Sequence, residues 1–309
     1  MRNWTPVAIV LNVLAVSCTN SGTAPLDGGS SADASSSTNA DAAQEGGFTA
    51  TLVDVHAHIW PLNKEDNDKY IDDLAAVART ERVRIVLGLH ASQPPHRPPT
   101  YSTDHDTWTL EAVSKYPDVY IPSLNGFDPA DSASVEYVRT QLATGKWKVL
   151  GELDLRNKPK QTTTPANHAN MMQMYPLAAQ YKVPVLIHWE SCYPSDCTAG
   201  EAELNDALTK NPSTTFIFAH TCPIDQMKAH PNLHCEHEVQ ATPLPSDGFD
   251  RVMVGTDIQQ TSLQVGYGPG KSKHYRDTIA EIRAELAKLS PEDAERVAIG
   301  NARLLKIVE

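Results

Sequence analysis

LVDVHAHIW, residues 52–60, has the alternation of polar and apolar side chains that is typical of a β-strand. Two sets of positions alternate along it: Val53, Val55 and Ala57, and Asp54, His56 and His58. Successive side chains of a strand point to opposite faces, so the three polar groups are predicted to share one face. A strand of this composition has either a solvated face or a metal site.

Short apolar runs of this kind recur along the rest of the chain. Eight are predicted to be strands: 52–59, 83–90, 119–124, 148–153, 183–189, 214–220, 232–239 and 251–257. Apolar residues at helical spacing lie between many of them: 68–80, 107–115, 132–143, 168–181 and 201–210. Eight strands alternating with helices over about 260 residues predict a (β/α)8 TIM barrel. Hydrophobicity supports the seventh strand least, because its sequence, NLHCEHEV, is polar.

The first residues are predicted to direct export. Arg2 precedes a short apolar run and small residues that lead to Cys18. This pattern is typical of a bacterial lipoprotein signal at residues 1–18, in which Cys18 is lipidated; an ordinary signal peptide with an incidental cysteine is the alternative. Residues 19–47 are rich in Ser, Ala, Gly, Thr and Asp, which predicts a disordered linker. The barrel, residues 48–309, is then expected at a membrane, in the periplasm or at the cell surface.

The composition limits which binding partners and which cellular compartment are expected. The formal net charge of −12 argues against nucleic acid, because phosphate binding depends on Lys and Arg, and we expect a small-molecule substrate. Four cysteines follow the signal: Cys192, Cys197, Cys222 and Cys235. An even number in an exported chain predicts two disulfides. Local pairing, 192 with 197 and 222 with 235, is one arrangement, and pairing of 192 with 222 is its rival.

Ionisable residues close five of the predicted strands. They are His56 and His58, Glu152, His188, His220 and Asp257. The C-terminal ends of barrel strands meet at one mouth, so these side chains are predicted to converge there. Any one of them alone would more often be a structural histidine or a helix cap. Together, the imidazoles and carboxylates predict a bound divalent metal, zinc first, with one or two ions per chain.

These segments resemble the amidohydrolase superfamily, and most closely its amidohydrolase-related branch of metal-dependent hydrolases and decarboxylases. The resemblance rests on an ordered set: DVHAHIW, GELDL, VLIHWE, FAHT, VGTDI and the closing LSPEDAERVAIGNARLLKI. It spans nearly everything after the linker. In the closing segment an Asn-Ala pair precedes a Leu-rich turn, as in the final helix of that branch, and Ser290 and Pro291 favour a helix start.

The resemblance implies a role for each candidate. Metal ligands are matched by the histidines: His56, His58, His188 and His220. The last of them is a second-metal ligand in binuclear members and a catalytic acid/base in mononuclear ones. Asp257 matches a metal contact that is also the general base. Glu152 lies where binuclear members place a bridging carboxylate, although many members of the branch have no ligand there. Asp54 is expected to orient the histidines.

Three further residues are candidates for substrate contacts. Trp60 and Trp189 follow metal-ligand positions, and Arg156 lies on the same strand face as Glu152 if the strand continues. A structural ion pair of Arg156 with Asp154 or another acid is the alternative. The site as a whole permits a hydrolase of an amide, ester or lactone, a decarboxylase, or a surface-tethered binding protein without activity. The complete ligand set argues against the third.

Overall fold

The computed structural model describes most of the barrel domain. The described residues are 47–59, 64–89, 101–194, 196–238, 244–246, 248–258, 263–265 and 273–309. The predicted signal peptide with Cys18, the linker up to residue 46 and Trp60 lie outside them. Within the described ranges, no helix combines the length and the apolar character needed to cross a membrane.

Strands and helices alternate along the described chain. The strands are β1 (Leu52–Ile59), β2 (Val83–Leu89), β3 (Tyr120–Leu124), β4 (Val149–Asn157), β5 (Thr162–Thr163), β6 (Val185–Trp189), β7 (Phe216–Phe218), β8 (Leu233–Glu238), β9 (Val252–Gly255), β10 (Gln264–Val265) and β11 (Lys273–His274). The helices are α1 (Lys64–Glu81), α2 (Thr103–Lys115), α3 (Ala133–Ala143), α4 (Met171–Tyr181), α5 (Cys197–Lys210), α6 (Ile224–Ala229), the 3₁₀ helix η1 (Phe249–Arg251), α7 (Tyr275–Leu286), α8 (Pro291–Glu295), the π-helix η2 (Arg296–Gly300) and α9 (Asn301–Leu304).

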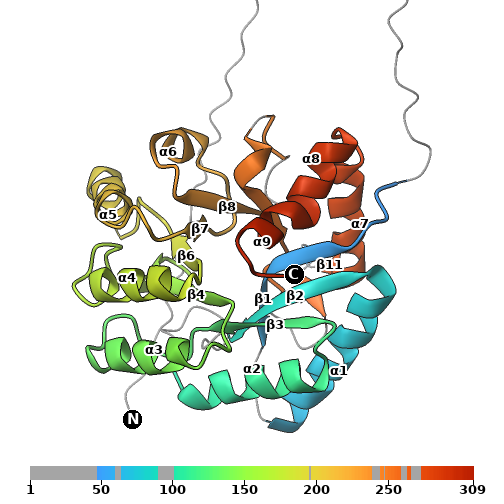
Figure 1. Cartoon of the computed structure of the whole chain (residues 1–309), viewed down its shortest axis with the longest axis horizontal. Helices are drawn as coiled ribbons and strands as arrows, with labels where there is room; N and C mark the ends of the chain where they lie inside the picture. Colours follow the sequence, from blue (N-terminus) through green and yellow to red (C-terminus); the bar gives the residue numbers. More distant parts are fainter. Residues whose placement is uncertain are drawn as a thin grey trace, which may run out of the picture. The chain divides into compact units, whose positions relative to one another are not determined.

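The strands close into a barrel. In the described part of the chain, nine strands form one sheet in the order β3-β2-β1-β9-β8-β7-β6-β4-β5, and β3 also pairs with β4. Because β5 is a two-residue antiparallel addition to β4, the other eight strands form a closed ring of parallel pairs. Helices α1 to α7 follow one another around the outside of this ring (Figure 1). The predicted TIM barrel is confirmed, including the polar strand β8.

Side-chain caps set several of the helix starts. The hydroxyl of Ser290 accepts a hydrogen bond from the N–H of Asp293 at 3.1 Å, directly before Pro291 opens α8. The Asp196 carboxylate likewise accepts from the N–H of Thr198 at the start of α5, at 2.9 Å. Such caps satisfy N–H groups that have no partner within the helix. The start predicted at residues 290 and 291 is therefore confirmed.

Apolar side chains pack in an inner and an outer layer. The inner layer takes a residue from nearly every barrel strand: Val53, Val86, Ile121, Val149, Leu186, Ile217 and Met253. The C-terminal residues Ile307 and Val308 join this inner layer. Asn301 donates to the carbonyl oxygens of Phe249 and Val252, both at 2.7 Å, where β9 begins. The C-terminal segment thus covers the barrel end where the strands begin and leaves the opposite end for the ionisable residues.

Candidate metal centre

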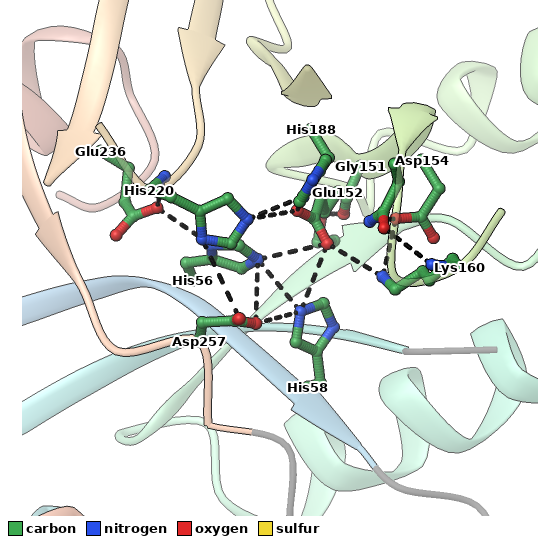
Figure 2. Close-up of polar contacts among 12 residues, drawn as sticks. His56, His58, Gly151, Glu152, Asp154, Lys160, His188, His220, Glu236 and Asp257 are labelled. Carbon is green, nitrogen blue, oxygen red and sulfur yellow. Dashed lines mark hydrogen bonds and ion pairs between the residues drawn. The ribbon is translucent and has the colours of Figure 1, made fainter. Parts of the chain in front are cut away.

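The ionisable residues predicted at the strand ends meet at one small cavity. It has a volume of about 160 Å³, and its lining includes Glu152, His188, His220 and Asp257. Figure 2 shows these groups and the two β1 histidines pointing toward one another. His220 and Asp257 lie beyond β7 and β9, because both strands end two residues earlier than predicted. Both residues have left-handed backbone conformations, with φ of 69° and 49°.

The first histidine pair, His56 and His58, projects from β1. Their Nε2 atoms lie 3.0 Å apart. Asp257 Oδ1 lies 2.9 Å from His58 Nε2 and 3.6 Å from His56 Nε2. Glu152 Oε2 lies 3.5 Å from each of the two nitrogens. Two ring nitrogens and two carboxylate oxygens therefore converge at this half of the site.

The second histidine pair consists of His188 on β6 and His220 after β7. His188 Nδ1 and His220 Nε2 lie 2.8 Å apart. Glu152 Oε1 lies 3.0 Å from the former nitrogen and 3.2 Å from the latter. The two oxygens of Glu152 are thus divided between the two histidine pairs, one oxygen to each (Figure 2).

An extra residue in β1 turns the first histidine pair toward the cavity. Between Asp54 and Ala57, β1 uses three residues where its neighbour β2 uses two. A bulge of this kind reverses the alternation of side chains beyond it. Val55 packs in the inner layer of the barrel, and the next residue, His56, also faces inward, as its contacts within the site show.

The predicted common face of Asp54, His56 and His58 is therefore wrong. Asp54 accepts hydrogen bonds from the N–H of His56 (3.2 Å), from the N–H and hydroxyl of Thr256 (3.0 and 2.7 Å) and from the hydroxyl of Tyr275 (3.0 Å), which belongs to the outer layer. Burial raises the pKa of Asp54 to about 7 despite these hydrogen bonds. Asp54 thus links the backbone of β1 to Thr256, the residue directly before Asp257. Its carboxylate hydrogen-bonds to the main chain of His56 and, among the described residues, to no histidine ring.

Strand β4 has a second irregularity, directly before Glu152. At this point three residues of β4 span two residues of β6. Gly151 has a φ of +126°, and a Cβ at this position would lie 2.2 Å from the carbonyl oxygen of Leu186. Only glycine avoids both the steric overlap and the strained backbone. The Gly-Glu dipeptide of the sequence is therefore what brings the carboxylate between the two histidine pairs.

The histidines and carboxylates of the site shift one another's pKa values. Burial lowers the pKa of His56 and His220, but the surrounding carboxylates outweigh burial and raise both values well above 6.5. Burial raises the pKa of Glu152 and Asp257, but the neighbouring histidines, and a lysine beside Glu152, outweigh it and lower both values. For His58, burial dominates and lowers the pKa. Both carboxylates are therefore ionised at neutral pH.

Three residues of the site were not identified from the sequence: Glu236, Glu238 and Lys160. Glu236 Oε2 lies 3.0 Å from His56 Nδ1, and Glu238 Oε2 lies 3.5 Å from His220 Nδ1. Both belong to β8, and their alternate positions at the end of a barrel strand were the available signal. Lys160 follows β4 and reaches back to Asp154 Oδ1 at 2.7 Å. No pattern in the sequence marks this lysine.

Two of the three predicted substrate contacts, Arg156 and Trp189, lie outside this cavity. Arg156 donates through Nε to Glu203 at 2.8 Å and through Nη1 to the carbonyl oxygen of Tyr193. Its guanidinium also lies 5.3 Å from the ring centre of Trp189. Trp189 packs in the outer apolar layer, and neither side chain lines the cavity. Arg156 therefore forms the structural ion pair that was its alternative, and Trp189 is a packing residue.

The cysteines pair locally. Disulfides join Cys192 to Cys197 and Cys222 to Cys235, which confirms two bridges and excludes the rival pairing. The first bridge closes the segment after β6. The second joins the segment after His220 to β8. Both bridges therefore lie next to elements that carry site residues.

The donor set fits a divalent cation. Glu236 faces His56 Nδ1, so that nitrogen carries a ring proton and Nε2 is the nitrogen that is directed at His58 Nε2. Facing nitrogens at 3.0 Å, with carboxylate oxygens beside them, need a proton or a cation between them. Imidazole nitrogens and carboxylate oxygens are the ligands that zinc, manganese and related ions take in proteins. The buried cluster is thus consistent with a metal centre.

No protein-family model and no curated protein sequence matches the chain. Solved structures do match in fold. The 2,6-dihydroxybenzoate decarboxylase from Rhizobium has 12% identity and a TM-score of 0.55, over 82% of this chain and 98% of that chain. A dihydroxybenzoic acid decarboxylase from Polaromonas, solved with bound manganese and the inhibitor 2-nitroresorcinol, has 13% identity and a TM-score of 0.54, over 82% and 96%. Dihydroorotase from Campylobacter jejuni has 12% identity and a TM-score of 0.54, over 84% of both chains. The chain therefore has the barrel fold of these solved enzymes, which is the structural match that its motifs predicted.

Proposed function

We propose that this protein is a metal-dependent hydrolase of the amidohydrolase superfamily that acts on the amide, ester or lactone carbonyl of a small molecule. The observation that carries the proposal is the position of Glu152, whose two oxygens face the two histidine pairs separately. A carboxylate divided in this way suits two cations better than one.

The residues that would hold the ions fall into two sets. Around the first histidine pair they are His56, His58, Glu152 Oε2 and Asp257 Oδ1, and around the second they are Glu152 Oε1, His188 and His220. Bound divalent ions lower the pKa of water from 15.7 to about 7 and polarise a substrate carbonyl. The histidine-rich donor set favours zinc, and manganese is a second candidate.

Asp257 is the proposed general base. Its Oδ1 faces the first histidine pair, and its Oδ2 lies 3.9 Å from His220 Nδ1. The histidines lower the pKa of Asp257 despite its burial, so the carboxylate is ionised. Its position beside both histidine pairs would let it accept a proton from the attacking water. It then gives the proton to the leaving group. Lys160 also lines the cavity and offers an N–H to a substrate oxygen.

Metal analysis of wild type and of Glu152→Gln tests the proposal. If Glu152 bridges two ions, the wild type should retain about two per chain after dialysis, and the variant about one. Glu238→Gln is the matched control, since this carboxylate lines the same cavity but lies outside the gap between the histidine pairs. Wild-type protein that takes up no divalent metal would refute the function. Equal metal content in wild type and Glu152→Gln would exclude the bridge.

A decarboxylase on the same site is the second candidate function. The fold matches to two decarboxylases favour it. The two reactions differ in their product, so a panel of lactones, aryl esters, N-acyl compounds and aromatic carboxylates should be assayed for acid release and for carbon dioxide. Carbon dioxide without hydrolysis would assign the lyase. Metal uptake without any turnover on a broad panel would instead favour a binding protein.

We further propose that the protein is exported and held at a membrane through a lipid on Cys18. The two disulfides support export, because such bridges persist in oxidising compartments. The substitution Cys18→Ser should move the protein from the membrane fraction to the soluble fraction. Unchanged sedimentation with membranes would refute the anchor.

A further inference from the structure

Glu236 on β8 contacts both histidine pairs through a single oxygen. Its Oε2 lies 3.0 Å from His56 Nδ1, and the same oxygen accepts the main-chain N–H of His220 at 2.7 Å. The residue is fully buried and does not line the cavity. Among the described residues, its other oxygen, Oε1, has no hydrogen-bond partner. The hydrogen bonds of this carboxylate to the described residues are therefore made with His56 and His220, both in the candidate site.

The contact with His56 fixes the ring. A carboxylate at Nδ1 selects the tautomer with the proton on that nitrogen, and it sets the plane of the imidazole. The opposite nitrogen, Nε2, is then the one that faces His58 and Glu152. Without this acceptor the ring of His56 could rotate, or could place its proton on the nitrogen that faces the site.

The contact with His220 fixes the backbone. His220 has a φ of 69°, a conformation that is unfavourable for a residue with a Cβ unless the surroundings hold it. The N–H of His220 is held by Glu236, and its carbonyl oxygen accepts the N–H of Glu238 at 3.3 Å. Residues of strand β8 therefore hydrogen-bond both the N–H and the carbonyl oxygen of His220. In this left-handed conformation the ring of His220 points toward His188.

Gly255 on β9 makes room for the carboxylate. A Cβ at this position would lie 2.5 Å from Glu236 Oε1 and 2.6 Å from its Cγ. Any side chain on this glycine would displace Glu236 from the space between the two histidines. Gly255 of the VGTDI segment therefore has no side chain because Glu236 of the neighbouring strand occupies that space.

We propose that Glu236 is a positioning residue that couples the two halves of the metal centre: one buried oxygen orients His56 in the first half and His220 in the second. The inference rests on the proposed metal-dependent function. It predicts that the loss of this single carboxylate, which touches no ion, weakens both halves together.

Cadmium binding provides a readout that does not depend on activity. With ¹¹³Cd NMR, the wild type should give two resonances, one for each half. His58→Asn should remove or shift the first, and His188→Asn the second. Glu236→Ala should perturb both, and calorimetry should show affinity lower by about 10- to 100-fold, the usual effect of removing a group that orients a ligand. Glu236→Gln should restore most of the affinity, because an amide oxygen still accepts both hydrogen bonds.

Asp106 provides the matched control. It is also a buried carboxylate that accepts main-chain N–H groups, those of Asn125 at 3.2 Å and Gly126 at 3.0 Å, but it lies outside the cluster. Asp106→Ala should lower thermal stability and leave both cadmium resonances in place.

Three results would overturn the inference: unchanged affinity in Glu236→Ala, perturbation of one resonance only, or equal losses in Asp106→Ala. If Glu236→Ala does not fold, Glu236→Gln decides, because a loss as large as that of a ligand variant would contradict a purely positional role. Failure of the wild type to bind cadmium refutes the proposed function itself.

Discussion

Lys160 Nζ lies 3.4 Å from Glu152 Oε2, so a buried ammonium group contacts the carboxylate that faces both histidine pairs. The same nitrogen lies 2.7 Å from Asp154 Oδ1. Burial lowers the pKa of the lysine, but Asp154 and Glu152 outweigh burial and raise it, so the group stays charged. A permanent cation therefore stands beside the atoms that would bind a metal, and it compensates their charge when no metal is there.

Replacement of this cation should lower the stability of the metal-free protein and raise its affinity for metal. In Lys160→Met, two buried carboxylates lose their partner, which costs about 3–5 kcal/mol for a broken buried pair. Metal should bind more tightly in the variant, because the repulsion from the ammonium is gone. Urea unfolding with chelator and with saturating zinc should show a larger stabilisation by metal in the variant than in the wild type.

Lys64 is the matched control for this prediction. It also has two carboxylate partners, Asp68 at 2.5 Å and Glu111 at 3.0 Å, but on the exposed surface. Lys64→Met should change neither quantity beyond experimental error, because exposed ion pairs contribute little. An identical response of the two variants would show that Lys160 has no special relation to the metal centre.

Asp257→Asn tests the proposed base. The amide keeps the shape of the side chain and removes its basicity, so turnover should fall by about 10²–10⁴-fold, the usual contribution of a positioned acid or base. Metal content should fall only modestly, because the histidines remain. The rates are to be measured on whichever substrate the panel identifies. Near-normal turnover with metal bound would remove Asp257 from the mechanism and make His220 the candidate base.

The metal-free protein should lose stability in alkaline solution. The pKa values of His56 and His220 are raised in the folded state because neighbouring carboxylates outweigh burial. Protonation of these two rings therefore stabilises the fold fully below pH about 6.5, and this contribution disappears as the pH rises through their raised values. His58, whose pKa burial lowers, acts in the opposite direction: its unfolded ring loses its proton near pH 6.5, so this contribution is complete about one unit above that pH and does not cancel the fall at higher pH.

Urea unfolding in the presence of chelator, between pH 6.5 and 9, measures this effect. The free energy of unfolding should fall with pH in the wild type and less steeply in His220→Asn. Saturating zinc should reverse the trend, because metal binding requires the deprotonated rings and releases their protons. A flat profile of the chelated wild type would contradict the raised pKa values.

The two disulfides should contribute unequally to stability. Chain entropy alone gives about 3 kcal/mol for Cys222–Cys235, which spans 13 residues, and about 2 kcal/mol for Cys192–Cys197, which spans 5. Paired Cys→Ala variants should follow this order in denaturant unfolding. The opposite order would mean that local contacts after β6 outweigh loop closure.

The barrel could be predicted from the sequence because its signal is local. Apolar runs and helical spacing are properties of short segments, and eight predicted strands with helical stretches between many of them leave few other folds. The same holds for the histidines and acids at strand ends, since the fold places all those ends at one mouth. Local pairing of the cysteines was one of three arrangements that the sequence alone permitted.

Only the tertiary structure decided which way the key side chains point. Alternation placed Asp54 with His56 and His58, but an extra residue in β1 puts it on the opposite face, and an isolated strand carries no record of its pairing register. Glu236 joined the site for the same reason, because its partners His56 and His220 belong to other segments of the barrel. Lys160 contacts the strand directly before it, but no pattern in the sequence marks the turn that brings it back. The sequence determined that the histidines and acids predicted at strand ends reach the mouth of the barrel, because this depends on periodicity. The structure decided how they divide into two halves, because this depends on contacts between segments far apart in the chain.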